Sequence, residues 1–353
     1  ENMEVEMLKN FYKGKKVVVT GHTGFKGAWL SLVLTYFGAN VHGISLSPYD
    51  KRGNLYKILG LKKIIKSNYL DIRNINKLDK KLQEIKPQMI FHLAAQPLVI
   101  ESYKNPIQTI ESNINGLCNL LESSKKNNNL KAILNVTTDK CYENLEKGLP
   151  FKENDRLGGS DIYSASKACS EILTKAYYKS FFENKINIST ARAGNIIGGG
   201  DFGDDRIIPD LIDAVINNKY LQVRSPKSIR PWQHILDVIN GYLILMKKTY
   251  QTKNFFESYN FAPQTRKHSD VQFVVESMSK ILRYNKVKYG KNPKYKESII
   301  LRLNSSKARK ELSWRPKFTI IQTLNKTADW YNSFIKNENI MEKSLYDIEE
   351  YFN

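Results

Sequence analysis

Residues 17–27 of the chain read VVVTGHTGFKG, and this stretch decides the fold class. The β-branched run before Gly21 predicts a strand, because such side chains pack well on a pleated sheet. Apolar residues recur at helical spacing over residues 29–37, so a helix is expected to follow. Between strand and helix, glycines stand three residues apart, at positions 21, 24 and 27. The stretch therefore predicts a strand, a tight turn and a helix.

A turn of this kind suits the binding of a dinucleotide. Glycines allow the backbone to approach a pyrophosphate closely, and the helix N-terminus offers free N–H groups and a positive dipole end. Glycine-rich turns also occur without a ligand, but the place of this one in the first strand-turn-helix unit favours a cofactor site. The residues expected to contact the cofactor here are Gly21, Thr23, Gly24, Phe25, Lys26 and Gly27.

Strands and helices are predicted to alternate along the first half of the chain. Further strands are expected at 41–46, 89–93 and 132–136, and helices at 74–85, 106–126 and 163–182. This alternation is typical of an α/β fold with a doubly wound parallel sheet of the Rossmann type. Residues 1–190 are expected to form the dinucleotide-binding domain. Residues 191–353 are expected to form mainly a smaller C-terminal substrate-binding lobe, with some segments returning to the first domain.

The sequence leaves the choice between NAD and NADP open. An acidic residue at the end of the second strand would bind a ribose hydroxyl, and a basic residue would bind a 2′-phosphate. Asp50 favours NAD, whereas Lys51 and Arg52 favour NADP, and all three also suit an ordinary loop. NAD is the expected cofactor.

Two further segments are expected to contact the cofactor. Asp71 follows an extended segment and, with Ile72 beside it, is a candidate for the adenine end. A turn or a helix cap is an alternative role for this aspartate. Ala94 and Ala95 follow the strand predicted at 89–93 and are expected to complete the cofactor contacts.

A tyrosine and a lysine, Tyr163 and Lys167, stand four residues apart in a predicted helix, which places them on one face. A nearby ammonium, together with a positively charged nicotinamide ring, favours the phenolate and lowers the pKa of the tyrosine. The lysine can also hold the nicotinamide ribose, so both residues are expected to contact the cofactor. Thr138 follows the strand at 132–136 and is placed to share a substrate alcohol with Tyr163. These three residues are therefore predicted to be catalytic.

Specific motifs run through most of the chain. They are TGHTGFKG at 20–27, HLAAQPLV at 92–99, TDKCY at 138–142, YSASK at 163–167, ARAGNIIGGGD at 191–201, DRIIPD at 205–210 and RPWQH at 230–234. Together they resemble the CDP-glucose 4,6-dehydratases, a branch of the sugar-nucleotide dehydratases in the extended short-chain dehydrogenase superfamily. The resemblance covers most of residues 15–260 and, weakly, the tail through residues 314–316.

The resemblance implies an NAD-dependent enzyme that converts CDP-glucose to CDP-4-keto-6-deoxyglucose and water. Tyr163 would take the proton of the C4 hydroxyl while a hydride passes to NAD. The resulting ketone acidifies the C5 proton, so water leaves across C5 and C6 before the hydride returns to C6. Asp139 as protonated acid and Lys140 as neutral base would supply the elimination. Lys140 departs from the glutamate of the broader 4,6-dehydratases but matches the CDP-glucose branch; a surface ion pair with Asp139 is the alternative.

Six polar residues are expected to bind the nucleotide sugar. They are Gln96, Ser102, Asn195, Arg206, Arg230 and His234. The resemblance places Asn195 and the two arginines near the pyrophosphate, whose charge needs cationic or amide donors. Gln96 and Ser102 would face the sugar. For His234, packing in the core is an equal alternative to substrate binding.

The composition excludes several other classes of protein. The net charge is +20 at pH 7, but the lysines are scattered, which is typical of solvated faces rather than of a nucleic-acid site. Such a charge would still help to collect an anionic substrate. Cys118, Cys141 and Cys169 are too widely spaced for a disulfide framework or a zinc site, so no metal and a cytoplasmic location are expected. No signal core and no membrane-spanning run are present, so no membrane insertion is expected.

Two alternatives remain at this point. A sugar-nucleotide 4-epimerase or reductase of the same superfamily would use Thr138, Tyr163 and Lys167 without the elimination pair. A catalytically silent dinucleotide-binding protein would need none of them. The family resemblance also implies a homodimer or homotetramer.

Overall fold

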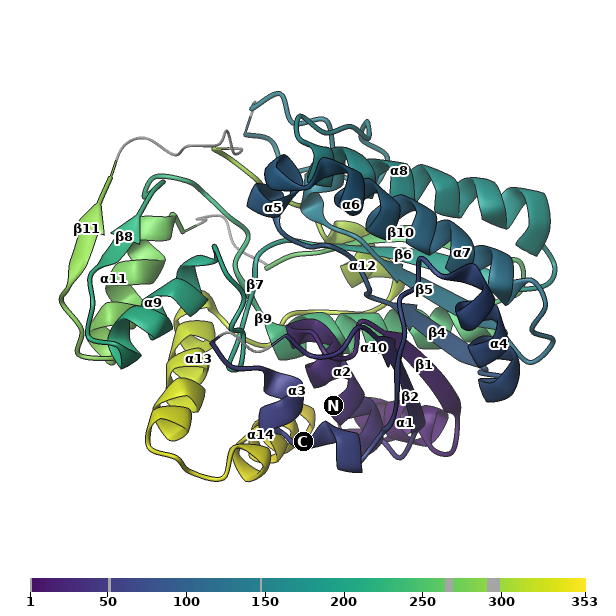
Figure 1. Cartoon of the computed structure of the whole chain (residues 1–353), viewed down its shortest axis with the longest axis horizontal. Helices are drawn as coiled ribbons and strands as arrows, with labels where there is room; N and C mark the ends of the chain where they lie inside the picture. The colour runs from purple at the N-terminus through teal and green to yellow at the C-terminus, as the bar shows by residue number, and fades with distance from the viewer. Residues whose placement is uncertain (1, 50–51, 147, 264–268, 291–298) are drawn as a thin grey trace.

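A seven-stranded parallel sheet lies at the centre of the molecule (Figure 1). The computed structural model describes residues 2–49, 52–146, 148–263, 269–290 and 299–353. The strands lie in the order β10-β6-β5-β4-β1-β2-β3, and all neighbouring pairs run parallel. Their bounds are β1 Lys16–Thr20, β2 Asn40–Ser45, β3 Lys66–Tyr69, β4 Met89–His92, β5 Ala132–Val136, β6 Asn187–Ala193 and β10 Phe256–Phe261. The sheet grows outward from β1 in both directions, which confirms the predicted doubly wound α/β fold.

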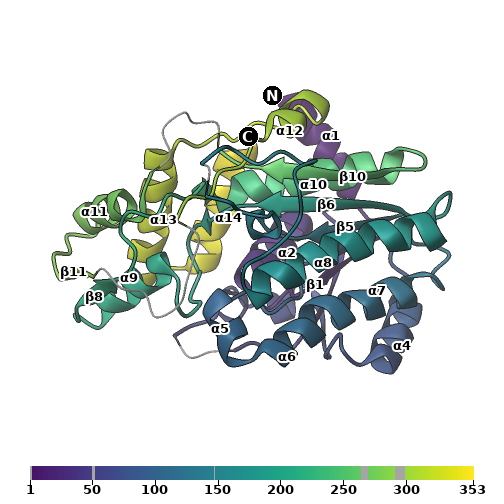
Figure 2. The same cartoon turned by 90° about the horizontal axis from the view of Figure 1, so that it is seen from above.

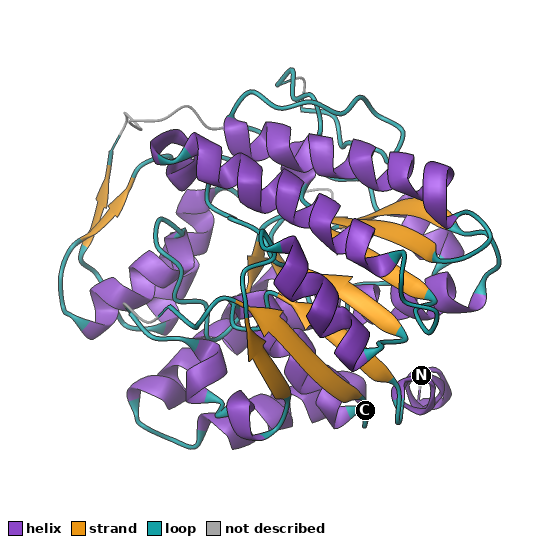
Figure 3. Ribbon diagram, turned by 45° about the vertical axis from the view of Figure 1, so that its right-hand side comes forward, coloured by secondary structure: helices purple, strands orange, loops and turns teal. Residues whose placement is uncertain are grey.

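Helices cover both faces of this sheet (Figures 2 and 3). Alternate residues of each central strand therefore pack into two separate apolar clusters. In β1, Val17 and Val19 belong to one cluster, whereas Val18 belongs to the other. The first cluster includes side chains of α2 and α10, and the second includes side chains of α4 and α7. The helices beside the sheet are α1 Asn2–Tyr12, α2 Phe25–Tyr36, α4 Ile75–Ile85, α5 Val99–Lys104, α6 Pro106–Ile110, α7 Gly116–Ser124, α8 Ile162–Tyr177 and α10 Ile235–Gln251.

A smaller group of elements extends beyond one edge of the sheet, at the left in Figure 1. It contains two short parallel strand pairs, β8 with β11 and β7 with β9. The remaining elements are α3 Leu55–Ile58, β7 Ile196–Ile197, α9 Ile207–Ile216, β8 Leu221–Val223, β9 Gln233–His234, α11 Val271–Ile281, β11 Val287–Tyr289, α12 Ser306–Glu311, α13 Ile320–Ile335 and α14 Ile340–Phe352. The chain returns to the sheet between them, because α10 packs on it and β10 pairs with β6.

Two of the long predicted helices contain a wider turn. The helix expected at 106–126 consists of α6, a π-helical segment Glu111–Asn115 and α7. The helix expected at 163–182 consists of α8 and a π-helical segment Tyr178–Phe182. Sequence periodicity alone does not distinguish such segments from an α-helix. In the part of the chain that the structure describes, no helix combines the length and apolar character that crossing a membrane requires.

The glycine turn brings three elements into backbone contact. A Cβ atom on Gly27 would lie 2.1 Å from the carbonyl oxygen of Gly21, so no side chain fits between α2 and the end of β1. Gly21 has a φ of +74°, in the left-handed region that favours glycine. A Cβ atom there would lie 2.8 Å from the backbone nitrogen of Ala94, which follows β4. The turn therefore depends on these two glycines.

We expect Gly27→Ala to lower the free energy of unfolding by about 1–3 kcal/mol, the usual cost of overpacking. Denaturant titration at neutral pH, followed by circular dichroism, measures the change. Gly24→Ala is the matched control, because a Cβ there would meet the Gly21 oxygen at 3.4 Å, an ordinary contact. Its free energy of unfolding should change by less than about 0.5 kcal/mol. Equal losses in the two variants would contradict the packing explanation.

Candidate active site

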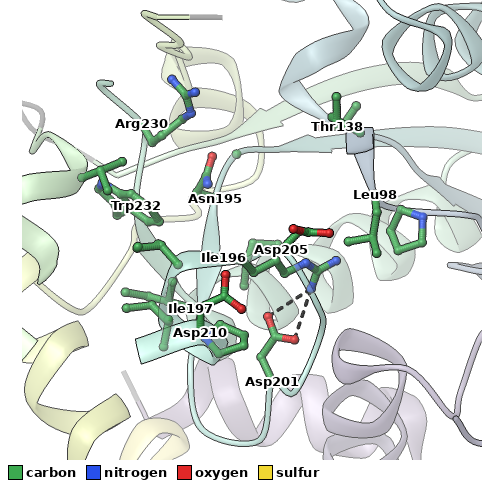
Figure 4. Close-up of a pocket in the computed structure, with 18 of the residues that line it drawn as sticks. Leu98, Thr138, Asn195, Ile196, Ile197, Asp201, Asp205, Asp210, Arg230 and Trp232 are labelled. Atoms are coloured by element: carbon green, nitrogen blue, oxygen red, sulfur yellow. Dashed lines mark hydrogen bonds and ion pairs between the residues drawn. The ribbon is translucent and has the colours of Figure 1, made fainter. Parts of the chain in front are cut away.

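A cavity of about 300 Å³ lies where the carboxyl ends of the strands meet the smaller lobe. Ligands bind at this edge in open parallel α/β sheets. Figure 4 shows Thr138 and Leu98 on one side of the cavity, and Arg230 and Trp232 on the other. The sequence-predicted residues on its wall are Phe25, Lys26, Thr138, Asp139, Lys140, Tyr163, Asn195, Arg206 and Arg230. The structure thus gathers residues from distant segments around one space.

Tyr163 lies in the first turn of α8, and its side chain lines the cavity. Asp161 caps this helix, since its carboxylate accepts a hydrogen bond of 2.9 Å from the Ser164 backbone N–H. Burial raises the pKa of Tyr163 to about 12, while a hydrogen bond with Thr138 acts in the opposite direction. The predicted lowering of this pKa therefore needs a further positive charge beside the phenol ring.

Lys167 lies one turn further along the same helix and is 7% exposed. Its ammonium donates a hydrogen bond of 3.3 Å to the carbonyl oxygen of Val136, at the end of β5. Burial lowers the pKa of Lys167 to about 8. The lysine therefore keeps its charge at neutral pH, behind the tyrosine rather than on the cavity wall.

Asp139 and Lys140 form a short 3-10 turn with Cys141 directly after Thr138. Asp139 is only 3% exposed, and its Oδ1 accepts a hydrogen bond of 3.0 Å from the Thr138 hydroxyl. Its Oδ2 has no hydrogen-bond partner among the described residues. Burial raises the pKa of Asp139, and the nearby Lys140 opposes this shift. A buried carboxyl with one unpaired oxygen can act as a proton donor at this position.

Arg230 and Asn195 line the side of the cavity opposite Thr138 (Figure 4). Arg230 donates hydrogen bonds of 2.9 and 3.1 Å to the carbonyl oxygens of Ile229 and Ile299. Its positive charge also acts to lower the pKa of Asp139. The backbone of Asn195 is fixed by a hydrogen bond of 3.0 Å from the Gln233 N–H, which leaves its side chain at the cavity.

Aspartate–arginine pairs surround the rest of the cavity, and only some of their members were predicted. Arg206 pairs with Asp201 at 3.0 Å, and Arg224 pairs with Asp205 at 3.2 Å. Arg206, Asp201, Asp205 and Arg224 all line the cavity. Sequence reasoning missed the aspartates and Arg224, although three aspartates among residues 201–205 were a signal. An anionic ligand can replace a carboxylate on such an arginine, because the oxygens of either group accept hydrogen bonds from the same guanidinium N–H groups.

Lys26 reaches this cavity as well as belonging to the glycine turn. Burial lowers its pKa to about 7, and the positive charges of Lys167 and Arg206 act in the same direction. Asp139 and Asp201 act in the opposite direction. This lysine therefore lies between the glycine turn and the residues predicted to be catalytic.

The glycine turn fits the pyrophosphate of a dinucleotide. Gly24 is the N-cap of α2 and provides no side-chain cap, so the first N–H groups of the helix remain available to an anion. Thr23 is turned the other way, with its hydroxyl 2.7 Å from the Ser45 hydroxyl at the end of β2. The missing Cβ atoms of Gly21 and Gly27 let this helix end pack closely against the backbone that follows β1 and β4.

At the expected adenine end, Asp71 is engaged by Arg73, and Arg52 is engaged elsewhere. The Asp71 carboxylate accepts hydrogen bonds from the backbone and guanidinium of Arg73, and the hydrogen bond from the guanidinium holds the pKa of Asp71 below its usual value. Ile72 is buried beside Gly116. Arg52 pairs with two carboxylates, Asp210 at 2.6 Å and Asp204 at 3.3 Å, so a 2′-phosphate would have to displace both of them. Asp50 and Lys51 lie outside the described residues.

Three expected substrate residues do not line the cavity in the described part of the chain. Gln96 is held by Leu98 and by the Thr109 hydroxyl at 2.8 Å, and Ala95 precedes it on the same loop. Ser102 is fully buried and accepts a hydrogen bond of 3.3 Å from the Tyr163 N–H. His234 caps α10 and is 4% exposed, and burial lowers its pKa to about 3. All three side chains support the backbone around the site.

Comparison with known proteins gives a consistent result along the whole chain. The family model described as GDP-mannose 4,6 dehydratase matches residues 18–327. A CDP-glucose 4,6-dehydratase of Salmonella typhimurium is 40% identical over 354 residues, which cover 98% of each chain. Among solved structures, an epimerase of Methanothermobacter thermautotrophicus has a TM-score of 0.82 at 22% identity, over 94% of this chain and 97% of its own. A dTDP-glucose 4,6-dehydratase of Bacillus anthracis, in complex with NAD, has a TM-score of 0.77 at 24% identity, over 93% and 99%.

We expect Asp139→Asn to raise the thermal unfolding midpoint at pH 8 by a few degrees. Because the folded pKa of Asp139 is raised, ionisation of this carboxyl opposes folding at high pH, and an amide avoids that cost. The advantage should shrink as the pH is lowered toward the ordinary pKa of 3.8, since the carboxyl is then neutral. Scanning calorimetry between pH 4 and 8, a range that begins near the ordinary pKa, measures this difference. Asp329→Asn, at an exposed position of α13, is the control for exchanging a carboxylate for an amide. A midpoint difference for Asp139→Asn that stays constant with pH would refute the assignment.

Proposed function

Since this chain belongs to the GDP-mannose 4,6 dehydratase family, we propose that it converts CDP-glucose to CDP-4-keto-6-deoxyglucose and water. Family membership confirms the resemblance stated from the sequence motifs, and the chain is an enzyme of this family. The observation that carries the proposal is the turn after β5, where Thr138, Asp139 and Lys140 line one cavity with Tyr163. The identity of 40% to a CDP-glucose enzyme over the full length supports the choice of nucleotide.

NAD is the cofactor that this site would hold. The pyrophosphate would lie on the uncapped N-terminus of α2, beside Gly21 and Gly24, and the adenosine near Asp71 and Ile72. When bound there, NAD accepts a hydride from C4 of the sugar and returns a hydride to C6, so no external reductant is consumed. The engagement of Arg52 by Asp210 supports NAD over NADP.

The oxidation of C4 requires a base for the hydroxyl proton. Tyr163 fills this role, and Thr138, which already hydrogen-bonds to the tyrosine, holds the same hydroxyl. Lys167 keeps a positive charge behind the tyrosine and favours its phenolate form. The product of this step is a ketone at C4, which makes the neighbouring C5 proton acidic.

The elimination requires one base and one acid on the same turn. Lys140, in its neutral form, removes the C5 proton, and the electron pair of that bond forms the double bond between C5 and C6. The C6–O bond breaks, and Asp139 donates a proton so that the oxygen leaves as water. Burial, which raises the pKa of Asp139, supports its role as the protonated acid. Lys140 then returns its proton to C5 as the hydride reaches C6.

The nucleotide diphosphate needs cationic donors on the lobe side of the cavity. Arg206, Arg230 and Asn195 would supply them, as the sequence predicted, because all three side chains line the wall. Arg206 is now paired with Asp201, and a phosphate oxygen would take the place of that carboxylate. The half-buried Lys26 lies within the field of the same arginine and adds to the positive potential.

A 4-epimerase or reductase would use the same fold, and both epimerases and dehydratases occur among the structural relatives. Such an enzyme would leave Asp139 and Lys140 without a chemical role. The position of this pair beside Tyr163 supports the dehydratase over these alternatives.

We also propose that the enzyme acts as a homodimer or homotetramer in the cytoplasm. The three cysteines are free thiols, which supports a reducing compartment. The family resemblance supports self-association, and light scattering on the purified protein gives the number of chains.

The purified protein with NAD should remove one water from CDP-glucose and should form no net NADH. Mass spectrometry of the product and the alkaline absorbance of a 4-keto sugar detect the reaction. dTDP-, GDP- and UDP-hexoses serve as the comparison panel. Loss of water from another nucleotide sugar alone would exclude CDP-glucose as substrate. A product of unchanged mass would favour the epimerase, and no reaction with any member would favour the silent binder.

Lys140→Ala should lower kcat by about 100-fold or more, because the C5 proton loses its base. C4 oxidation should continue, so enzyme-bound NADH should accumulate in a single turnover while exchange of the C5 proton with deuterated water stops. Tyr163→Phe should instead prevent both signals. Lys152→Ala, at an exposed position outside the cavity, is the control and should behave as the parent enzyme. Loss of NADH formation in Lys140→Ala would show that this lysine acts before the elimination.

A further inference from the structure

A buried ion pair lies directly beneath the catalytic turn. Glu171 on α8 and Arg192 on β6 are each 3% exposed, and their Oε2 and Nη2 atoms are 2.7 Å apart. The Thr190 hydroxyl donates a second hydrogen bond of 2.7 Å to the same carboxylate oxygen. Neither charge reaches the cavity wall, so the proposed reaction gives these two residues no direct role.

Both ends of the turn 138–141 are tied to this one pair. Before the turn, the Thr137 hydroxyl donates a hydrogen bond to Glu171 Oε1. After the turn, the Tyr142 hydroxyl accepts a hydrogen bond of 2.8 Å from Arg192 Nη1 and donates one of 2.7 Å to Asn260. The Arg192 guanidinium also lies 5.0 Å from the centre of the Tyr142 ring. Glu171 therefore binds the residue before the turn, Arg192 binds the residue after it, and the two charges bind each other.

The same pair is attached to the helix that carries the other catalytic residues. Glu171 lies one turn beyond Lys167 and two turns beyond Tyr163 on α8, so these residues share a helix face. A short path of bonded groups thus connects the helix to the turn with Thr138, Asp139 and Lys140. If the helix and the turn moved relative to each other, Tyr163 and Lys167 on α8 would separate from the proposed catalytic residues of the turn.

We propose that the Glu171–Arg192 pair is a positioning device that fixes the turn 138–141 against α8, so that oxidation at C4 and elimination across C5 and C6 occur on one bound sugar. The catalytic part of this inference rests on the proposed function, whereas the structural part does not. Fixed geometry matters here, because a small misplacement of an acid or base costs a large factor in rate. Glu171 and Arg192 act through the turn and do not touch the substrate.

The hydrogen bonds from the pair to Thr137 and Tyr142 can each be removed while both Glu171 and Arg192 stay in place. Thr137→Val removes the hydroxyl that binds Glu171, and Tyr142→Phe removes the hydroxyl that binds Arg192 while keeping the ring that stacks on Phe151 at 4.8 Å. Ser170→Ala is the matched control. It removes a hydrogen bond of 3.1 Å from Asn135 of β5 to α8, and the hydrogen bonds of the described residues do not connect the Ser170 side chain to the turn.

Cys141 provides a readout that needs no substrate. Its side chain is fully buried within the turn, whereas Cys169 is exposed and Cys118 is half-buried. In a Cys118→Ser, Cys169→Ser background, the rate of labelling by Ellman's reagent reports how often the turn opens, because a buried thiol is inert. Thr137→Val and Tyr142→Phe should each accelerate labelling by about tenfold or more, and Ser170→Ala by less than about twofold. Equal labelling rates in all three variants would overturn the proposal.

Single-turnover kinetics then test the catalytic consequence. In the two turn variants, the ratio of product formation to enzyme-bound NADH formation should fall by about tenfold, since the elimination residues lie on the loosened turn. The control should keep the ratio of the parent. An equal decrease of both steps would assign the pair a general structural role and would overturn the inference. Absence of turnover in the parent enzyme would refute the proposed function instead, and the labelling result would still decide whether the pair fixes the turn.

Discussion

The parallel direction of all seven strands is the constraint on which the site depends. Because the strands share one direction, their carboxyl ends meet at one edge, where every following loop begins. β1 leads into the glycine turn, and its neighbour β4 leads to Ala94; a hydrogen bond of 2.8 Å between Thr20 and His92 joins the two strand ends. β5 leads into the turn at Thr138, and β6 leads to Asn195. The order of the strands thus becomes the order in which the proposed cofactor turn, catalytic turn and substrate contacts follow one another across the cavity.

Burial at this edge determines which groups the chain prepares by itself. A low-polarity environment favours neutral forms, so it raises the pKa values of Asp139 and Tyr163 and lowers those of Lys26 and Lys167. For Asp139, which must donate a proton, a raised pKa favours the required protonated form. For a tyrosine that must accept one, it is unfavourable and needs a compensating positive charge. Burial therefore favours the protonated form of the elimination acid, whereas the oxidation base needs a positive charge beyond those of Arg206 and Lys167.

The fold and the residues of the turns could be predicted because their signals are local. Three glycines in seven residues, or Thr138 followed by Asp139 and Lys140, are adjacent in sequence and remain adjacent in space. Contacts between distant segments left no such signal: Arg52 and Asp210 are 158 residues apart, and nothing in either segment specifies the pair. For Gln96, Ser102 and His234, the signal in the sequence has two possible explanations. Their residue types suit substrate binding, but a polar side chain binds the nearby backbone equally well, and only the folded structure distinguishes the two.

The Glu171–Arg192 pair contributes more to fixing the geometry of the proposed site than to the stability of the fold. A buried ion pair adds little net stability, because the loss of hydration offsets most of the attraction between the charges. Packed apolar side chains would serve a core equally well, yet they would not supply four directional hydrogen bonds to Thr137, Thr190 and Tyr142 and between the two charges. Apolar contacts also tolerate sliding, whereas charged hydrogen bonds weaken steeply with distance and angle. The advantage of charge at this position is therefore a fixed geometry, and the turn with Asp139 and Lys140 is the part of the molecule that needs it.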